Sequence, residues 1–302
     1  MDSIFAQTYT NFEVILVDDG SPDNCPEICD GIAASDSRVR VIHRKNGGLS
    51  AARNSGTAVA RGVYLTYIDS VDSIVPFYLE ILHNDICRTG AGISVLRCRE
   101  VDEEFIPGTC LSDAVECEVL SAEDACRRMF TKEETFMITA WGKLYRRELS
   151  GILQYPEGKI HEDEYVTYKA FYAAGKVAVS SYTGYNYLQR NGSIVHSFSE
   201  KNLEVLEAFR QAPEFFDAAG DAGLRGLAQK RLMRMLRSCY FRAEKLDASV
   251  RKRIYDEWIS EYRKIRNNPG TDFAFSERAA NRLFALSPKI YASLKSMTNS
   301  GS

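Results

Sequence analysis

The sequence predicts an α/β protein in which a doubly wound sheet is followed by a helical region. Short β-branched runs alternate with helix-like segments through the first two hundred residues, which is typical of strands that are covered by helices on both faces. From about Ser199 no β-rich run occurs, and the spacing of apolar residues is helical almost to the end. We therefore expect one domain over residues 1–198 and a helical region over residues 199–302.

The individual elements follow from local signals. Strands are expected where β-branched and apolar residues run together, at residues 12–17, 39–43, 63–68, 92–98, 176–180 and 185–189. Helices are expected after capping or proline signals, at residues 21–34, 51–61, from Pro76, at 122–130 and at 162–174. Residues 99–120 are acidic and poorly periodic, so we expect a loop or hairpin there.

Composition excludes some classes of function. The formal net charge of −3 over 302 residues gives no electrostatic basis for binding nucleic acid. No run of eighteen apolar residues is present, so no segment is expected to span a membrane. The first residues lack the basic and apolar regions of a secretory signal, and we expect a cytoplasmic protein.

Acidic side chains follow two of the predicted strands. Asp18 and Asp19 end one of them, and Asp69 and Asp72 follow another. Between these strands, Gly47 and Gly48 precede a helix start that can accept an anion, and Arg53 adds a cation. Ligands of open α/β sheets bind beyond the carboxyl ends of the strands. The alternative is that these acids are only turn and helix-capping residues.

Four segments together resemble the inverting family 2 glycosyltransferases. They are residues 7–23 (QTYTNFEVILVDDGSPD), 46–56 (NGGLSAARNSG), 161–164 (HEDE) and 187–194 (YLQRNGSI). The resemblance covers roughly residues 1–200. It implies a GT-A fold, a mixed sheet flanked by helices. It also implies transfer of a sugar, with inversion, from a nucleotide-diphosphate sugar (UDP-sugar favoured) to a glycan or lipid-linked acceptor.

The resemblance implies roles on the nucleotide side. Asp19 would accept the N3 proton of uracil or the equivalent edge of another base, and Asp18 would support that loop. Gly48 and Arg53 would lie against the nucleotide, and Asp69 would reach the ribose or a metal. In the same family the loop that contains Gln189 and Arg190 closes over the diphosphate.

It also implies roles on the acceptor side. Asp163 would be the general base that deprotonates the acceptor hydroxyl, with Glu162 beside it. Trp141 would stack on an acceptor sugar. Two alternatives stay open: an acidic first turn also suits the helix dipole, and Trp141 also suits a protein core.

Two departures from the family bear on activity. The usual Asp-Ser-Asp-Asp pattern is Asp69-Ser70-Val71-Asp72 here, and valine cannot bind the expected Mg²⁺ or Mn²⁺, so Asp69 and Asp72 would have to hold the metal. His196 is a possible further ligand. The family's first strand has no counterpart, since Met1 falls inside the helix that follows it, and we expect a gap in the sheet. An inactive remnant or sugar-nucleotide-binding module is therefore an alternative function.

The C-terminal region offers two segments that mix cations with apolar residues at helical spacing, residues 230–237 and 282–291. Such segments can lie on an anionic membrane surface, which would make the protein peripheral at the inner face of the membrane. They can equally be helices that pack on the rest of the protein with a solvated basic edge.

Overall fold

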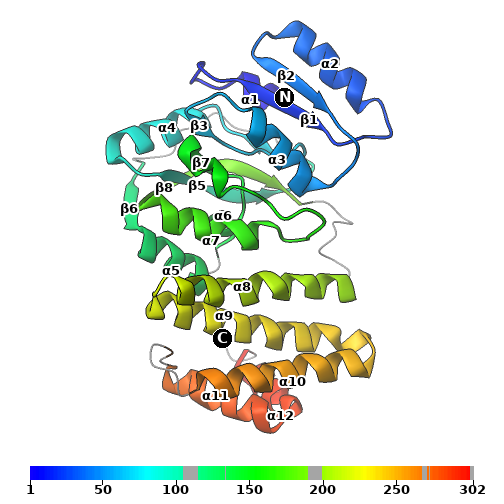
Figure 1. Cartoon of the computed structure of the whole chain (residues 1–302), viewed down its shortest axis with the longest axis vertical. Coiled ribbons are helices and arrows are strands. Elements are labelled where there is room, and N and C mark those ends of the chain that lie inside the picture. Colours follow the sequence, from blue (N-terminus) through cyan, green and yellow to red (C-terminus); the bar gives the residue numbers. More distant parts are fainter. Residues whose placement is uncertain (105–114, 133, 190–198, 267–270, 272, 300–302) are drawn as a thin grey trace. The chain divides into compact units, whose positions relative to one another are not determined.

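The structure is a computed structural model that describes residues 1–104, 115–132, 134–189, 199–266, 271 and 273–299. The chain divides into two compact units, Met1–Ser197 and Phe198–Ser302. The first unit contains all the described strands, and the second is helical (Figure 1). Within the described residues, every helix is too short or too polar to cross a membrane.

The strands of the first unit form two separate sheets. The smaller sheet pairs β1 (Val14–Asp18) with β2 (Val39–His43) in parallel, flanked by α2 (Cys25–Ser35) and α3 (Leu49–Val59). The order in the larger sheet is β3 (Tyr64–Leu65), β7 (Lys143–Arg146), β5 (Ile93–Val101), β8 (Lys176–Leu188) and β4 (Ser73–Ile74), with β6 (Cys117–Ser121) also paired to β8. β5 and β8 run parallel, and the other pairs are antiparallel, so the sheet is mixed.

No strand pairing joins β1 to β3 in the described part of the chain. The backbone amide of Val14 donates to the backbone carbonyl of Arg38, and the backbone carbonyl of Asp18 accepts from the backbone amide of Arg44. The backbone N–H and C=O groups of successive residues point to alternate edges of a strand. Those of Val14, Leu16 and Asp18 therefore point to β2, and those of Ile15 and Val17 point to the opposite edge of β1. The sheet is therefore interrupted beside β1.

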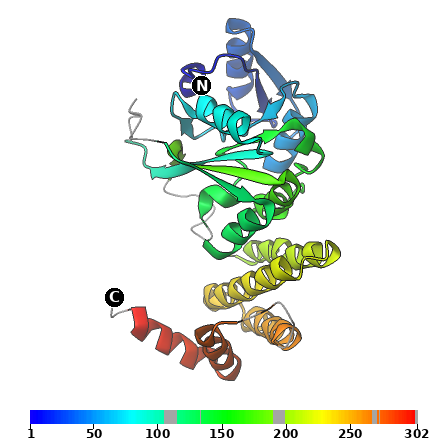
Figure 2. The same ribbon diagram turned by 90° about the vertical axis from the view of Figure 1, so that its left-hand side faces the viewer.

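Helices cover both faces of the larger sheet. Helix α4 (Tyr78–Thr89) lies on one face, and α5 (Ala122–Lys132), α6 (Thr135–Ile138) and α7 (Asp163–Ala174) lie on the other (Figures 1 and 2). Tyr78, Leu82 and Ile86 of α4 are fully buried against the sheet because their spacing of four residues puts them on one face of the helix. The short helix α1 (Asp2–Phe5) contacts β4.

Several elements differ from the sequence-based expectations. The third strand is only two residues long, and one continuous strand, β8, replaces the two expected at 176–180 and 185–189. Strand β7 was not predicted, and β6 lies inside the segment that was expected to be a loop or hairpin. These strands depend on pairing with β5 and β8 rather than on a strong local pattern.

The second unit has its own aromatic core. Its helices are α8 (Val205–Ala218), α9 (Ala222–Arg242), α10 (Ala248–Ile265), α11 (Phe275–Leu286) and α12 (Pro288–Asn299). Trp258 and Phe284 are fully buried, with ring centroids 4.7 Å apart, and Phe216 and Leu236 are also fully buried. Large apolar side chains at helical spacing therefore account for the packing of these helices.

Candidate active site

The centre of the candidate site is the buried guanidinium of Arg53, on α3. It contacts three carboxylates: Glu162 at 2.5 Å, Asp69 at 2.9 Å and Asp163 at 3.1 Å. Its side chain is 6% exposed, and those of Glu162 and Asp163 are 10% and 16% exposed. The structure thus brings together acids that lie about a hundred residues apart in the sequence.

Local backbone geometry positions these groups. Helix α3 begins after Gly48, whose φ of 83° lies in the left-handed region that glycine adopts without strain. Helix α7 begins after His161, which has a φ of 55° although it is not a glycine. Such backbone conformations are uncommon and cluster at functional sites. The turn at His161 presents Glu162 and Asp163 to Arg53.

Asn54 ties the segment before α7 to α3. Its side-chain amide donates to the carbonyl of Tyr155 at 2.8 Å and accepts from the amide of Tyr155 at 2.9 Å. The guanidinium of Arg53 lies 5.3 Å from the centre of the Tyr155 ring. Helix α3 therefore fixes the position of Tyr155 as well as of the acids.

The charges of the cluster alter its protonation equilibria. Burial alone would lower the pKa of Arg53, but Asp163, Asp69 and Glu162 raise it above its ordinary value. The pKa of Asp163 is raised to about 7, mainly because the carboxyl is buried. Arg53 and Lys143 act against this rise, and Glu162 and Asp69 add to it. Asp163 can therefore exchange a proton near neutral pH.

Lys143, on β7, is a buried lysine close enough to Asp163 for their charges to interact. Its amine donates to the carbonyls of Phe136 and Thr139, each at 2.5 Å. Burial lowers its pKa to about 7, while Asp163 and Cys98 act in the opposite direction. Lys143 is therefore held by carbonyls at the end of α6, and its charge acts on Asp163.

A second group lies at the end of β1. The Asp18 carboxylate accepts from the Ser21 amide and lies 3.0 Å from Nδ1 of His43, and these contacts lower its pKa. Asp19 accepts from the amides of Gly47 and Gly48 and from Arg44. In this structure Asp19 therefore holds the glycine turn that begins α3.

Gly20 makes the approach of these two loops possible. Its φ is 72°, and a Cβ at this position would lie 2.8 Å from the backbone nitrogen of Asn46. Any other residue would combine backbone strain with a clash against main-chain atoms. The loop contact thus requires glycine at position 20.

The metal position does not have the ligands that a divalent cation needs. Asp72 accepts from the Tyr185 hydroxyl at 2.7 Å and from the Leu188 amide at 2.9 Å, so it holds β8. Asp69 accepts from Arg53, and Val71 is 42% exposed. Among the described residues, no group of three His, Cys, Asp or Glu side chains is suited to a metal. The residues present here therefore do not fit a protein-held Mg²⁺ or Mn²⁺.

The remaining sequence candidates have different surroundings. Trp141 is 3% exposed and stacks on Tyr185 at 4.2 Å, so its indole lies in the core in this structure, as in the alternative that the sequence left open. The backbone amide of Gln189 donates to the backbone carbonyl of Val101 at the end of β5. Arg190 and His196 lie outside the described residues.

Sequence reasoning missed Asn54, Tyr155 and Lys143 as parts of the site. Asn54 lies inside the segment 46–56 that resembles the family, so its position next to Arg53 could have indicated a role in the site. Tyr155 and Lys143 have no distinctive pattern around them, and their roles depend on contacts between segments that are distant in the sequence.

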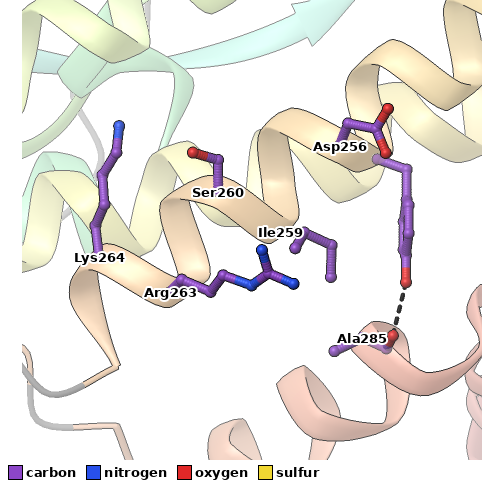
Figure 3. Close-up of a pocket in the computed structure, with 7 residues that line it drawn as sticks. Asp256, Ile259, Ser260, Arg263, Lys264 and Ala285 are labelled. Atoms are coloured by element: carbon purple, nitrogen blue, oxygen red, sulfur yellow. Dashed lines mark hydrogen bonds between the residues drawn. The ribbon is translucent and has the colours of Figure 1, made fainter.

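An open hollow of about 620 Å³ lies in the second unit (Figure 3). It lies between α10 and α11, and the Tyr255 hydroxyl donates to the Ala285 carbonyl across it. Its lining contains none of the residues described around Arg53. The hollow is therefore not part of the candidate active site.

Comparison with solved structures defines the class first. A crystal structure of residues 1–349 of TarS from S. aureus, in complex with UDP-GlcNAc, matches with a TM-score of 0.54. The match covers 94% of this chain and 74% of that chain, at 20% identity. With its mixed sheet flanked by helices, the first unit has the GT-A fold of nucleotide-sugar transferases.

The chain belongs to glycosyl transferase family 2, whose family model matches residues 1–151. It is 34% identical over 211 residues to the glycosyltransferase GlyA of Streptococcus pneumoniae serotype 4, covering 68% of this chain and 30% of that protein. It is 31% identical over 220 residues to GlyG of the same organism, covering 69% of this chain and 72% of that protein. The chain thus spans under a third of GlyA and nearly three quarters of GlyG.

Proposed function

We propose that the protein transfers a sugar, with inversion, from a UDP-sugar to a glycan or lipid-linked acceptor in the cytoplasm. The observation that carries this proposal is the Arg53 cluster, in which an acid beyond β3 meets two acids at the start of α7. Family membership supports glycosyl transfer, and the UDP-GlcNAc complex of TarS supports the choice of donor.

In this proposal Asp163 is the general base. The acceptor hydroxyl attacks the anomeric carbon as its proton passes to the Asp163 carboxylate. The bond from that carbon to the nucleotide diphosphate breaks, and its electron pair stays on the departing phosphate oxygen. One displacement of this kind inverts the configuration. Arg53 holds the carboxylate in place, and Glu162 lies on the acceptor side.

The donor side is assigned to the ends of β1 and β3. Asp19 would accept from the base and also holds the turn at Gly48, and Asp18 would support that loop. Asp69 would reach the ribose, and Gln189 would lie on the diphosphate side. No step of this assignment is placed on a metal, because the donor set described above does not fit one.

The test is Asp163→Asn. Asparagine keeps the size of the side chain but cannot accept the acceptor's proton, so transfer should fall by about 10²–10⁴-fold. UDP affinity, measured by calorimetry, should stay nearly unchanged. Glu164→Gln, in the same helical turn, is the matched control and should keep most of the activity.

A second variant tests the donor side. Asp19→Asn should weaken UDP binding, whereas Asp163→Asn should leave UDP binding nearly unchanged. Full transfer by Asp163→Asn would show that the base lies elsewhere.

A second candidate function is a sugar-nucleotide-binding module without turnover. It is favoured by Val71 at the expected metal position. The same assays separate the two candidates. UDP binding without release of UDP from any UDP-sugar, with or without acceptors, would favour the module.

A further inference from the structure

The last two helices expose large apolar side chains. Phe275 is 88% exposed and Leu286 is 83% exposed, and Ile290 and Leu294 are 54% and 47% exposed. Phe275 and Leu286 belong to α11, and Ile290 and Leu294 belong to α12. In Figure 2, the ribbon of α11 lies between those of α10 and α12. We call these four residues the outer face.

The outer face is distinct from the core side of α11. Phe275 and Leu286 are eleven residues apart, which is close to three full turns, so both point to the same side of the helix. Phe284 points to the other side and is fully buried against Trp258. Helix α11 thus carries apolar residues on two opposite sides, one buried at Phe284 and one exposed at Phe275 and Leu286.

The charge around the outer face is positive. Residues 275–294 contain three cations, Arg278, Arg282 and Lys289, all exposed, and one acid, Glu277. Glu277 accepts from Lys230 and from the amide of Ala274, where it caps α11. This local excess contrasts with the net charge of −3 for the whole chain.

We propose that the outer face docks on an anionic membrane surface. Exposed aromatic and aliphatic side chains beside cations suit the boundary between headgroups and acyl chains. A second copy of the chain is a poorer fit, because symmetric pairing would bring the same cations together. Docking deepens the proposed function by bringing the enzyme to lipid-linked acceptors, but vesicle binding does not depend on transfer.

The experiment is sedimentation of the full chain with vesicles of phosphatidylcholine alone or with phosphatidylglycerol. Binding should require phosphatidylglycerol and weaken as salt is added. The variant Phe275→Ser/Leu286→Ser should lose at least about tenfold in affinity, since both side chains would leave the acyl boundary. Arg282→Gln should lose about fivefold. Ile28→Ser, at a 51% exposed residue of α2, is the matched control and should bind like the parent.

Transfer to a soluble acceptor is measured on the same variants. An unchanged rate beside lost vesicle binding supports the docking surface independently of the reaction. Equal binding by the parent and Phe275→Ser/Leu286→Ser would overturn the proposal. So would a dimer seen by light scattering that Phe275→Ser/Leu286→Ser dissociates, because the outer face would then join two copies.

Discussion

At the scale of single residues, Arg53 connects segments that the sequence keeps far apart. One guanidinium contacts Asp69 beyond β3 and the two acids that begin α7. Removing one partner of such a buried group leaves the others uncompensated, so the cluster acts as a unit. The pKa of Asp163 is nevertheless raised, because burial of its carboxyl outweighs the opposing charge of Arg53.

That pKa predicts the pH dependence of transfer. A general base works only when it is ionised, and the pKa of Asp163 is raised from an ordinary value near 4 to about 7. We expect kcat/KM to fall about tenfold for each pH unit below about 6, measured as UDP release across pH 5–9. Glu164→Gln should keep this acidic limb. A decrease of kcat/KM that begins only near pH 4 would contradict the burial of the proposed base.

Val71 gives a second prediction at this scale. Its side chain is 42% exposed, so a carboxylate can replace it without disturbing the core. In the presence of UDP, Val71→Asp should bind Mn²⁺ more tightly, because a charged oxygen ligand is added next to Asp69. Val119→Asp, at a 47% exposed valine of β6, is the control. Equal Mn²⁺ affinity by calorimetry for parent and Val71→Asp would remove position 71 from the metal argument.

At the scale of elements, loops rather than strands set the geometry of the donor side. Strand β1 has an edge at Ile15 and Val17 that no described strand pairs, although its run of apolar residues is typical of an interior strand. The loop after it is held by Asp19, and its contact with the residue 44–48 turn depends on Gly20.

Substitutions of Gly20 and Gly31 provide a matched test of the loop contact. Gly20→Ala should lower the free energy of unfolding by about 1–3 kcal/mol, because alanine is strained at positive φ and its Cβ would meet backbone. Gly31→Ala, inside α2 with open space around it, should instead raise stability by about 0.5–1 kcal/mol. Urea unfolding curves measure both. A destabilised Gly31→Ala or a neutral Gly20→Ala would show that the loop contacts differ from those described.

At the scale of the whole molecule, the chain consists of two units with separate cores. The second unit buries Trp258 and Phe284 among its own helices, with Tyr240 and Tyr255 packed on the Phe284 ring. The first unit buries its apolar residues between its sheets and its own helices. Each unit therefore has the apolar burial that independent folding requires.

We propose that residues 199–302 fold alone. The isolated segment should give a helical circular dichroism spectrum and a cooperative thermal transition, because its aromatic core is internal. Trp258→Ala should abolish that transition or lower its midpoint strongly, since large core truncations cost about 3–5 kcal/mol. Lys252→Ala, at an exposed residue of the same helix, should change little. A non-cooperative melt of the parent segment would mean that the two units stabilise each other.

The sequence by itself determined the fold class, the family and the candidate base. Strand and helix periodicity is local, and the segments at 7–23, 46–56 and 161–164 are contiguous, so both can be recognised without coordinates. The family assignment is confirmed by the match over residues 1–151, and the GT-A fold by the solved structures. The role of Asp163 stays a prediction.

Only the tertiary structure decided how these residues meet. The placement of Trp141 in the core, the use of Asp72 to hold β8 and the position of Lys143 near Asp163 depend on pairings across many residues. Strands β6 and β7 and the length of β8 were decided in the same way. A local pattern states which side chains can be buried, but burial and hydrogen bonding are completed by partners that the chain brings together only when it folds.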